Sequence, residues 1–451
     1  MRNLTKFMTS LLAGLVLATT LAGTAGATAP TIDDGAKGKI TGSGATFPWN
    51  QYTKWFEYYR NYVNPSKFGT SSASKLVLDY TGGGSGAGVT NFKGSDRKKE
   101  TQMFSGNDGV LSSSDRTAID TALGVANDYI VIPMTAGPIS VAYRFDGLKQ
   151  KVSASSKKTT SATLRLNGEV LCGIYTGSIK KWNDAKIKAL NPLITNLTET
   201  DIIVNGRSDS SGTTFIFASY LGKSATAAQK NCGYESNFVS NTSTTFSGTA
   251  GTFTPVKTQP GTYFGAMRTA NGAAAIVGGD GNAGVAANIA GSNFSIGYVE
   301  LSYAVANDLK SAAIETKSKF TSGANKNKFN YVLPSATTAA AALAAAVSVE
   351  DPINPSTSFV QPVFAAGTGS YGIVGYSWLM VYKTWVSGGT DATKGQVQGL
   401  VAFLNWALTT GQSKLYTSDG VQGYAPIPSA ARTTAVSYLH TITYDGTAVW
   451  P

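Results

Sequence analysis

The sequence has 451 residues, enough for about two or three domains, and a formal net charge of +11. This charge favours anionic small molecules or surfaces as partners in general, but no dense basic tract predicts nucleic-acid binding. The sequence has one histidine and two cysteines, which are too few for most histidine-based catalytic triads and for histidine or cysteine metal centres. We expect no catalytic residues, no metal and no cofactor.

Residues 1–27 have the pattern of a secretory signal peptide. Arg2 and Lys6 precede an apolar stretch over residues 7–21, and small residues follow up to Ala27. We therefore expect cleavage after Ala27 and export to the periplasm, with secretion or the cell surface as the alternative. A permanent membrane anchor is the other interpretation, and the apolar stretch is too short for one.

Two segments near the N-terminus lead through glycines into the start of a helix. Residues 42–48 precede an aromatic amphipathic helix expected over residues 49–59, with Thr46 as its N-cap and Pro48 in its first turn. A strand over residues 76–80 runs into a glycine-rich turn and a second helix start. This turn lacks the Gly-Lys-Ser/Thr ending of a phosphate-binding P-loop.

A third helix start is the most polar of the set. It lies after strands expected over residues 130–134, 139–143 and 202–204. From Arg207 onward the sequence is Arg-Ser-Asp-Ser-Ser-Gly-Thr-Thr-Phe, and a helix is expected over residues 215–221. Free backbone N–H groups, hydroxyls and an arginine together favour an anion site. The alternative is a well-capped helix with a surface arginine. Glycine-rich loops are mostly ordinary turns, but three such starts favour a convergent anion pocket.

The remaining elements complete an alternating strand and helix pattern, which predicts an α/β protein. We expect a helix over residues 170–174, a buried strand over residues 378–382 and an amphipathic helix over residues 395–408. Three tracts are predicted to be loops or insertions: residues 149–161, 240–258 and 316–330.

The two cysteines, Cys172 and Cys232, bracket the Arg207 segment. In an oxidising compartment an isolated pair is most simply one disulfide, and two buried free thiols are the alternative. The single histidine, His440, is predicted to be a surface residue rather than a catalyst.

Seven sequence blocks resemble the phosphate-binding proteins that serve bacterial phosphate ABC transporters, and within them the secreted DING-like branch. The blocks follow one another in family order over essentially the whole chain after residue 27. They are residues 42–48, 83–88, 106–111, 173–183, 207–215, 296–300 and 423–428. The positions of Cys172 and Cys232 also resemble the disulfide of the DING-like members.

This resemblance implies a type II periplasmic-binding-protein fold, in which two α/β domains are joined by two crossovers and the ligand lies in the cleft between them. Domain one would comprise residues 28–138 and 374–451, and domain two residues 139–373. The implied phosphate ligands are Thr46, Phe47, Ser85, Asp108, Arg207, Ser211, Gly212 and Thr213.

The resemblance also implies individual roles for these ligands. Phe47 would donate its backbone N–H, and Arg207 would make the charged contact while held by Asp209. Asp108 would select hydrogen phosphate over sulfate, because a carboxylate can only accept and sulfate carries no proton. The chain departs from the family pattern at Asn107, where most members have serine, and in added length around residues 149–161 and 240–292.

Three functions follow as hypotheses. The first is a non-catalytic, monomeric receptor that delivers inorganic phosphate to the permease of an ABC importer. The second is a secreted phosphatase on the same fold. The sequence argues against it, because it shows neither a metal cluster nor a serine placed beside a general base. The third is an extracellular structural protein that binds phosphate incidentally.

Overall fold

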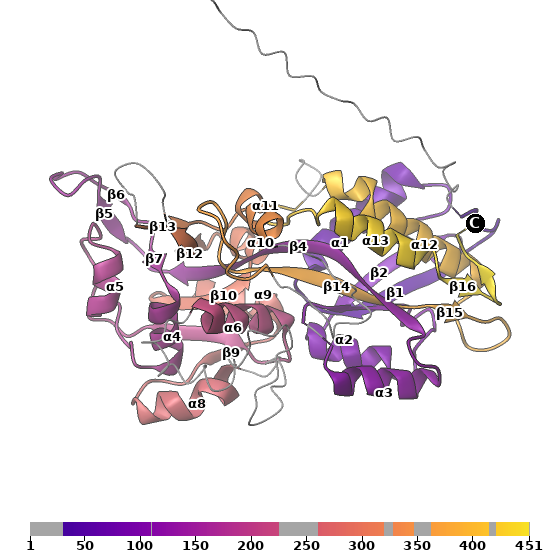
Figure 1. Ribbon diagram of the computed structural model, residues 1–451, viewed down its shortest axis with the longest axis horizontal. Helices are drawn as coiled ribbons and strands as arrows, with labels where there is room; N and C mark the ends of the chain where they lie inside the picture. The colour runs from indigo at the N-terminus through magenta and orange to yellow at the C-terminus, as the bar shows by residue number, and fades with distance from the viewer. Residues whose placement is uncertain are drawn as a thin grey trace, which may run out of the picture.

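The computed structural model describes residues 30–109, 111–224, 260–319, 328–346, 362–414 and 421–450, and a long mixed sheet runs through its centre (Figure 1). The strands of this sheet are β1 (Gly38–Gly44), β2 (Leu76–Gly82), β3 (Phe104–Asn107), β4 (Tyr129–Arg144), β8 (Ile203–Arg207), β9 (Val277–Gly279), β10 (Ser295–Glu300), β11 (Lys310–Ser311) and β14 (Val374–Tyr382). They lie in the order β2-β1-β3-β14-β4-β10-β8-β9, with β11 paired to β4. The expected α/β class is confirmed.

Two lobes share this sheet. In the first lobe, β1 pairs in parallel with β2 and β3. Its helices are α1 (Trp49–Tyr58), α2 (Gly84–Phe92), α3 (Ser113–Leu123), α12 (Lys394–Leu408) and α13 (Ser429–Leu439). In the second lobe, β8 pairs in parallel with β9 and β10. Its helices are α4 (Gly168–Thr176), α5 (Ala185–Leu190), α6 (Gly212–Ser224), α8 (Pro260–Ala270), α9 (Gly281–Gly291), α10 (Leu301–Ala306) and α11 (Ala336–Ala345).

The strands β4 and β14 connect the lobes (Figure 1). The first part of β4 pairs with β14, from Tyr129 opposite Tyr382 to Pro138 opposite Val374. Its last part pairs with β10 of the second lobe, as far as Arg144. The expected domain boundaries fall within β4 and at the start of β14, and they stay a prediction.

The expectation of two separate strands over residues 130–134 and 139–143 is wrong, because both belong to the single strand β4. Proline lacks an N–H donor, and within sheets it is confined to edge strands, first strand positions or bulges. Here Pro133 lies beside a bulge, since Trp378 pairs with Pro133 while the preceding Ser377 pairs with Thr135. The side chain of Gln412 donates to the carbonyl of the extra residue, Met134, at 3.0 Å. This side-chain hydrogen bond therefore compensates for the strand-pairing hydrogen bond that is lost at the bulge.

The helices expected over residues 49–59, 170–174, 215–221 and 395–408 are confirmed as α1, α4, α6 and α12, although their bounds differ by a few residues. The N-cap expectation for α1 is wrong: Pro48 occupies the N-cap, and a π-helical turn η1 (Tyr59–Val63) follows the helix. The hydroxyl of Thr46 is instead engaged with the second lobe.

Two of the three expected loops contain strands. Residues 149–161 form a hairpin of β5 (Lys149–Lys151) and β6 (Thr159–Ser161). Residues 316–330 include the end of β12 (Ala313–Lys319) and the start of β13 (Phe329–Val332), which pair in a small sheet with β7 (Arg165–Leu166). Residues 240–258 lie outside the described residues. The remaining short elements are β15 (Thr384–Trp385), β16 (Thr443–Tyr444), β17 (Thr447–Ala448) and the 3₁₀ turn η3 (Thr410–Lys414).

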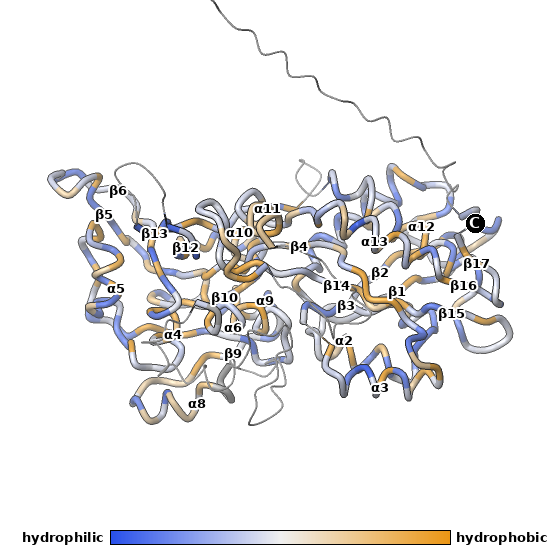
Figure 2. The backbone as a smooth tube through the Cα atoms, in the orientation of Figure 1, coloured by the Kyte–Doolittle hydropathy of each residue, from blue (hydrophilic) through white to orange (hydrophobic). Residues whose placement is uncertain are grey.

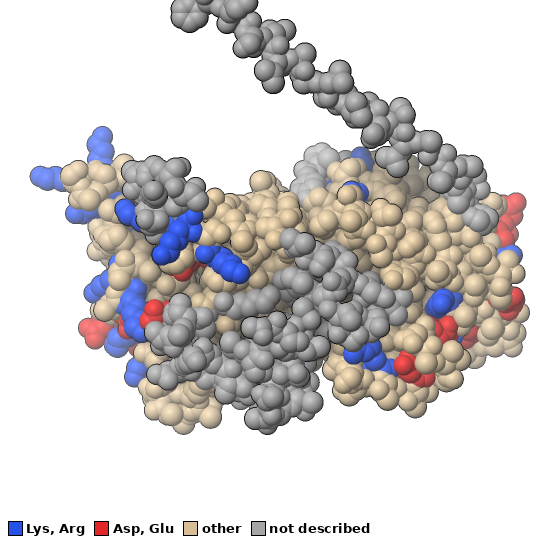
Figure 3. Space-filling view, viewed as in Figure 1, with Lys and Arg blue, Asp and Glu red and all other residues tan. Residues whose placement is uncertain are grey.

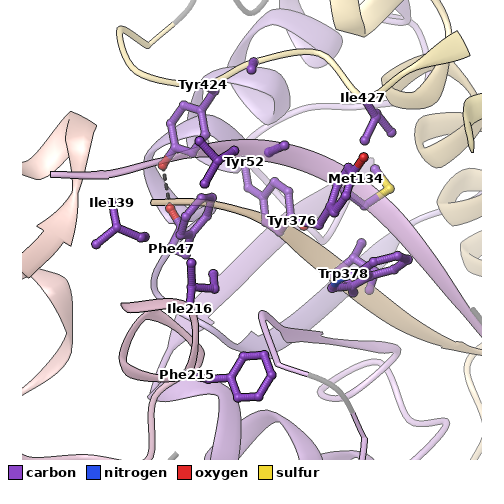
Figure 4. Close-up of a cluster of buried hydrophobic side chains, with 14 of the residues drawn as sticks. Phe47, Tyr52, Met134, Ile139, Phe215, Ile216, Tyr376, Trp378, Tyr424 and Ile427 are labelled. Carbon is purple, nitrogen blue, oxygen red and sulfur yellow. Dashed lines mark hydrogen bonds between the residues drawn. The ribbon is translucent and has the colours of Figure 1, made fainter. Parts of the chain in front are cut away.

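The core follows the central strands. All nine residues of β14 are buried, as are those of β4 from Tyr129 to Tyr143, so these strands have no solvent-facing side. Long hydrophobic stretches accordingly coincide with strands of the central sheet (Figure 2). Where the lobes meet, Phe47 of the first lobe lies near Ile216 of the second, and Tyr424 donates to the carbonyl of Phe47 at 2.5 Å (Figure 4).

Within the described residues, no helix combines the length and the apolar character needed to cross a membrane. Residues 1–27, where the signal peptide is expected, lie outside them. Cys172 is buried on α4, and its expected partner Cys232 is also outside the described residues, so the disulfide stays a prediction. His440, predicted to be a surface residue, is half-buried and stacks on Trp450 with ring centroids 4.3 Å apart.

Candidate functional site

Four helix starts meet where the lobes face each other. Those of α1 and α2 follow β1 and β2 of the first lobe, and those of α6 and α9 follow β8 and β9 of the second. Each helix thus begins just beyond the carboxyl end of a parallel strand, the position at which open α/β sheets bind ligands. All eight residues expected as ligands lie in this region and are buried: Thr46, Phe47, Ser85, Asp108, Arg207, Ser211, Gly212 and Thr213.

Ser85 on α2 links the lobes. Its Oγ accepts a hydrogen bond from the backbone N–H of Asp108 at 3.1 Å and another from the backbone N–H of Gly212 at 3.1 Å. Gly212 opens α6, and a Cβ added there would lie 2.4 Å from the Cβ of Asp108 and 2.7 Å from Ser85 Oγ. Only glycine therefore allows this approach of the lobes.

The guanidinium of Arg207 is buried at the end of β8 and held in a fixed orientation. Its Nε donates to Asp209 Oδ1 at 2.6 Å, and its Nη2 donates to Asp209 Oδ2. Its Nη1 approaches Thr213 Oγ1 at 3.4 Å. Asp209 also accepts the backbone N–H of Gly281 at 3.2 Å. The predicted pair of Arg207 and Asp209 is confirmed, and only 2% of the arginine surface is exposed.

The segment before α1 is fastened to the second lobe. Thr46 Oγ1 accepts from the side chain of Asn282 at 3.0 Å, and its carbonyl accepts the hydroxyl of Tyr303 at 2.7 Å. Nearby, Asn50 on α1 donates to Ser302 Oγ at 2.9 Å. Just before α6, Ser211 Oγ accepts the N–H of Thr214 at 3.1 Å, which gives the helix start a side-chain cap.

Two residues at the site were missing from the expected set. Ser377 on β14 donates its hydroxyl to Asp108 Oδ1 at 2.6 Å. Asn282 lies in the first turn of α9 and is fully buried. Its signal was a short apolar run followed by glycines at residues 276–281, the same pattern as in the other helix starts. Part of the tract 240–292, where added length is expected, belongs to the central sheet, since β9 pairs with β8. The comparison of length with the family stays a prediction.

A buried carboxylate adjoins the site. Glu300 ends β10, and its Oε2 accepts the backbone N–H of Ser302 at 3.0 Å and the hydroxyl of the same residue. Burial raises the pKa of Glu300 from 4.5 to about 8, and the nearby Asp108 carboxylate adds to this rise. Among the described residues, no group of three or more histidine, cysteine or acidic side chains could hold a metal ion.

A family model described as a PBP superfamily domain matches residues 28–410. The chain belongs to the PBP superfamily. Among its curated relatives in the superfamily, the phosphate-binding protein PstS of Methanocaldococcus jannaschii is 29% identical over 394 residues, which cover 85% of this chain and 82% of the relative. The phosphate-binding protein PstS 2 of Mycobacterium tuberculosis is 29% identical over 404 residues, covering 90% of this chain and 86% of the relative.

The fold of this PBP superfamily member also resembles that of PfluDING, a high-affinity periplasmic phosphate-binding protein whose structure contains phosphate. The two structures align with a TM-score of 0.56 at 20% identity, over 88% of this chain and 93% of PfluDING. The resemblance to phosphate-binding proteins and the two-domain periplasmic-binding-protein fold, both expected from the sequence, are thus confirmed.

Proposed function

We propose that this protein is an exported, non-catalytic solute-binding protein that captures inorganic phosphate between its lobes and delivers it to an ABC importer. The observation that carries the proposal is the convergence of four helix starts and the buried Arg207 on one interlobe position. The curated relatives, which are phosphate-binding proteins, support the same ligand. The importer's permease would be the partner, and the protein would act as a monomer.

In this proposal the phosphate oxygens are bound by fixed donors from both lobes. Arg207 supplies the positive charge, and its pairing with Asp209 keeps the planar guanidinium in place. The hydroxyls of Thr46, Ser85, Ser211 and Thr213 would donate together with the backbone N–H of Phe47. Gly212, whose N–H is donated to Ser85 Oγ, would line the site and let the backbone come close. The helix dipoles of α2 and α6 would favour the negative charge further.

Asp108 would discriminate between hydrogen phosphate and sulfate. Its Oδ1 already accepts the hydroxyl of Ser377, so the carboxylate is held in place by β14. A carboxylate can accept the proton of hydrogen phosphate, whereas fully ionised sulfate would place acceptor against acceptor in a buried site. Leaving a buried charged group unsatisfied in this way costs about 1–3 kcal/mol or more.

Calorimetric titration of the protein without residues 1–27 tests the proposal, with phosphate and sulfate as ligands at the same pH and ionic strength. We expect tight binding of phosphate and at least 100-fold weaker binding of sulfate. Equal affinities for the two anions would refute the assigned role of Asp108, and absence of phosphate binding would refute the function itself.

A further inference from the structure

Asn282 lies between two of the proposed phosphate ligands, one from each lobe. It is fully buried in the first turn of α9, and its Nδ2 lies 3.0 Å from Thr46 Oγ1 and 3.2 Å from Thr213 Oγ1. We propose that Asn282 is a positioning residue that fixes both threonine hydroxyls as donors to phosphate and closes the lobes over it. This inference rests on the proposed function.

The orientation of the Asn282 amide follows from its third partner. The backbone N–H of Glu300 can only donate, and the Asn282 atom that it reaches, at 2.9 Å, must therefore be the carbonyl oxygen Oδ1. The group that faces Thr46 and Thr213 is then the NH₂, which can only donate. Both threonine oxygens must act as acceptors toward Asn282.

Each threonine oxygen receives a second donor as well. Thr46 Oγ1 also accepts the backbone N–H of Asn282, at 3.2 Å. Thr213 Oγ1 also faces Nη1 of Arg207, at 3.4 Å. A hydroxyl oxygen has two lone pairs, so both are used and only the O–H proton remains for a further partner. That partner must be an acceptor, as a phosphate oxygen is.

The same NH₂ connects the lobes, because Thr46 precedes α1 in the first lobe and Thr213 lies in α6 of the second. Its two hydrogen bonds can exist together only when the lobes are closed. Asn282 therefore links closure to the correct polarity of the hydroxyls. Without it, each hydroxyl can rotate and present a lone pair to the anion, and the closed form loses an interlobe contact. The effect should appear mainly in the rate of phosphate release.

The first test compares Asn282→Ala with Asn288→Ala by phosphate titration and stopped-flow dissociation. Asn288 is on the same helix, and its side chain donates to the carbonyl of Gly278 in β9, at 3.1 Å, within the second lobe. We expect Asn282→Ala to weaken phosphate binding at least tenfold, largely through faster release, and Asn288→Ala to bind like the parent. Affinity of Asn282→Ala within twofold of the parent would overturn the inference.

A thermodynamic cycle separates positioning from general support of the fold. In a Thr46→Val, Thr213→Val background the hydroxyls are gone, so Asn282→Ala should weaken binding less than twofold further. The same tenfold loss in both backgrounds would show a role that does not act through the hydroxyls, and would overturn the inference.

A second variant serves if Asn282→Ala does not fold. Asn282→Asp keeps the shape and the acceptor for the Glu300 N–H, but replaces the donor by an acceptor that would draw both hydroxyl protons away from phosphate. We expect at least a 100-fold loss, and binding within twofold of the parent would overturn the inference. A parent protein that binds no phosphate would overturn the proposed function, and this inference with it.

Discussion

In the described part of the chain, Arg207 is the one buried cation that faces the other proposed phosphate ligands. Its neighbours fix the orientation of its guanidinium. Its guanidinium is held by Asp209, which is in turn bonded to the N–H of Gly281 in the same lobe. A bidentate arginine held in this way offers two parallel N–H donors to an oxyanion, whereas lysine offers a point charge on a flexible stem.

We therefore expect Arg207→Lys to weaken phosphate binding at least tenfold and Arg207→Ala to weaken it much more. One charge-assisted hydrogen bond is worth about 1.5–3 kcal/mol, and tenfold corresponds to about 1.4 kcal/mol. Calorimetry on the folded variants measures both losses. Arg144→Ala is the control, because Arg144 pairs with Asp146 at the surface. Parent-like binding by Arg207→Ala would place the anion site elsewhere.

Glu300 makes stability depend on pH. Its pKa is about 8 in the folded protein and near 4.5 when exposed. Between these two values the folded state binds more protons than the unfolded state, so this group lowers the free energy of unfolding as pH rises from about 4.5 to about 8. Each pH unit in this window corresponds to at most about 1.4 kcal/mol.

Glu300→Gln removes this titration. We expect the stability of the variant, relative to the parent, to improve steadily as pH rises through the window. Urea unfolding at several pH values measures this difference in stability. Glu57→Gln is the control, because Glu57 is half-exposed and pairs with Lys54 at the surface. Parallel stability profiles for parent and Glu300→Gln would contradict the expectation.

At the scale of elements, the bulge in β4 depends on one side chain. Gln412 is buried and makes three bonds: its amide donates to the carbonyls of Met134 at 3.0 Å and Ala407 at 2.9 Å, and its Oε1 accepts the N–H of Ile427 at 3.1 Å. A leucine of similar size would leave all three backbone groups unsatisfied in the interior.

We expect Gln412→Leu to lower the free energy of unfolding by about 3 kcal/mol or more, since each unsatisfied buried group costs about 1–3 kcal/mol. Chemical denaturation tests this, with the exposed Gln422→Leu as the matched control. A loss under about 1 kcal/mol would mean that the backbone at the bulge finds other partners.

At the scale of the whole molecule, the surface positive charge and the proposed phosphate site are separate features. Exposed lysines gather on the second lobe around the β5–β6 hairpin, including Lys149, Lys157 and Lys158 (Figure 3). Such surface charge attracts phosphate and sulfate alike and is screened within about 8 Å at physiological salt. The net charge of the chain therefore cannot supply selectivity, which must come from the buried groups.

The hydrogen bonds between the lobes suggest that the lobes close on each other when ligand binds. Ser85 with Gly212, Gly86 with Ser210 and Asn50 with Ser302 all join the two lobes. A ligand bound between them favours the closed form. Small-angle scattering should show a smaller radius of gyration with phosphate than without it, and no change with sulfate. Identical curves with and without phosphate would exclude closure driven by the ligand.

The sequence by itself determined the local elements and most of the candidate site. Helix α12 and the strand before Arg207 follow from short-range periodicity, and the hydroxyls and glycine of α6 mark its start, because caps and turns depend on neighbouring residues. The resemblance to phosphate-binding proteins supplied Asp108 and Ser85. These features need no knowledge of which distant segments meet.

Only the tertiary structure decided how the helix starts combine. Ser377 carries no local mark of a binding role, and Asn282 is marked only by the glycine-rich helix start before it. Both reach the site because β9 pairs with β8 and β14 pairs with β4. The continuity of β4 at the bulge beside Pro133 likewise depends on Gln412, which is 278 residues from Met134 in the chain. Strand pairing across hundreds of residues and satisfaction of buried polar groups are long-range conditions, and a local sequence pattern does not record them.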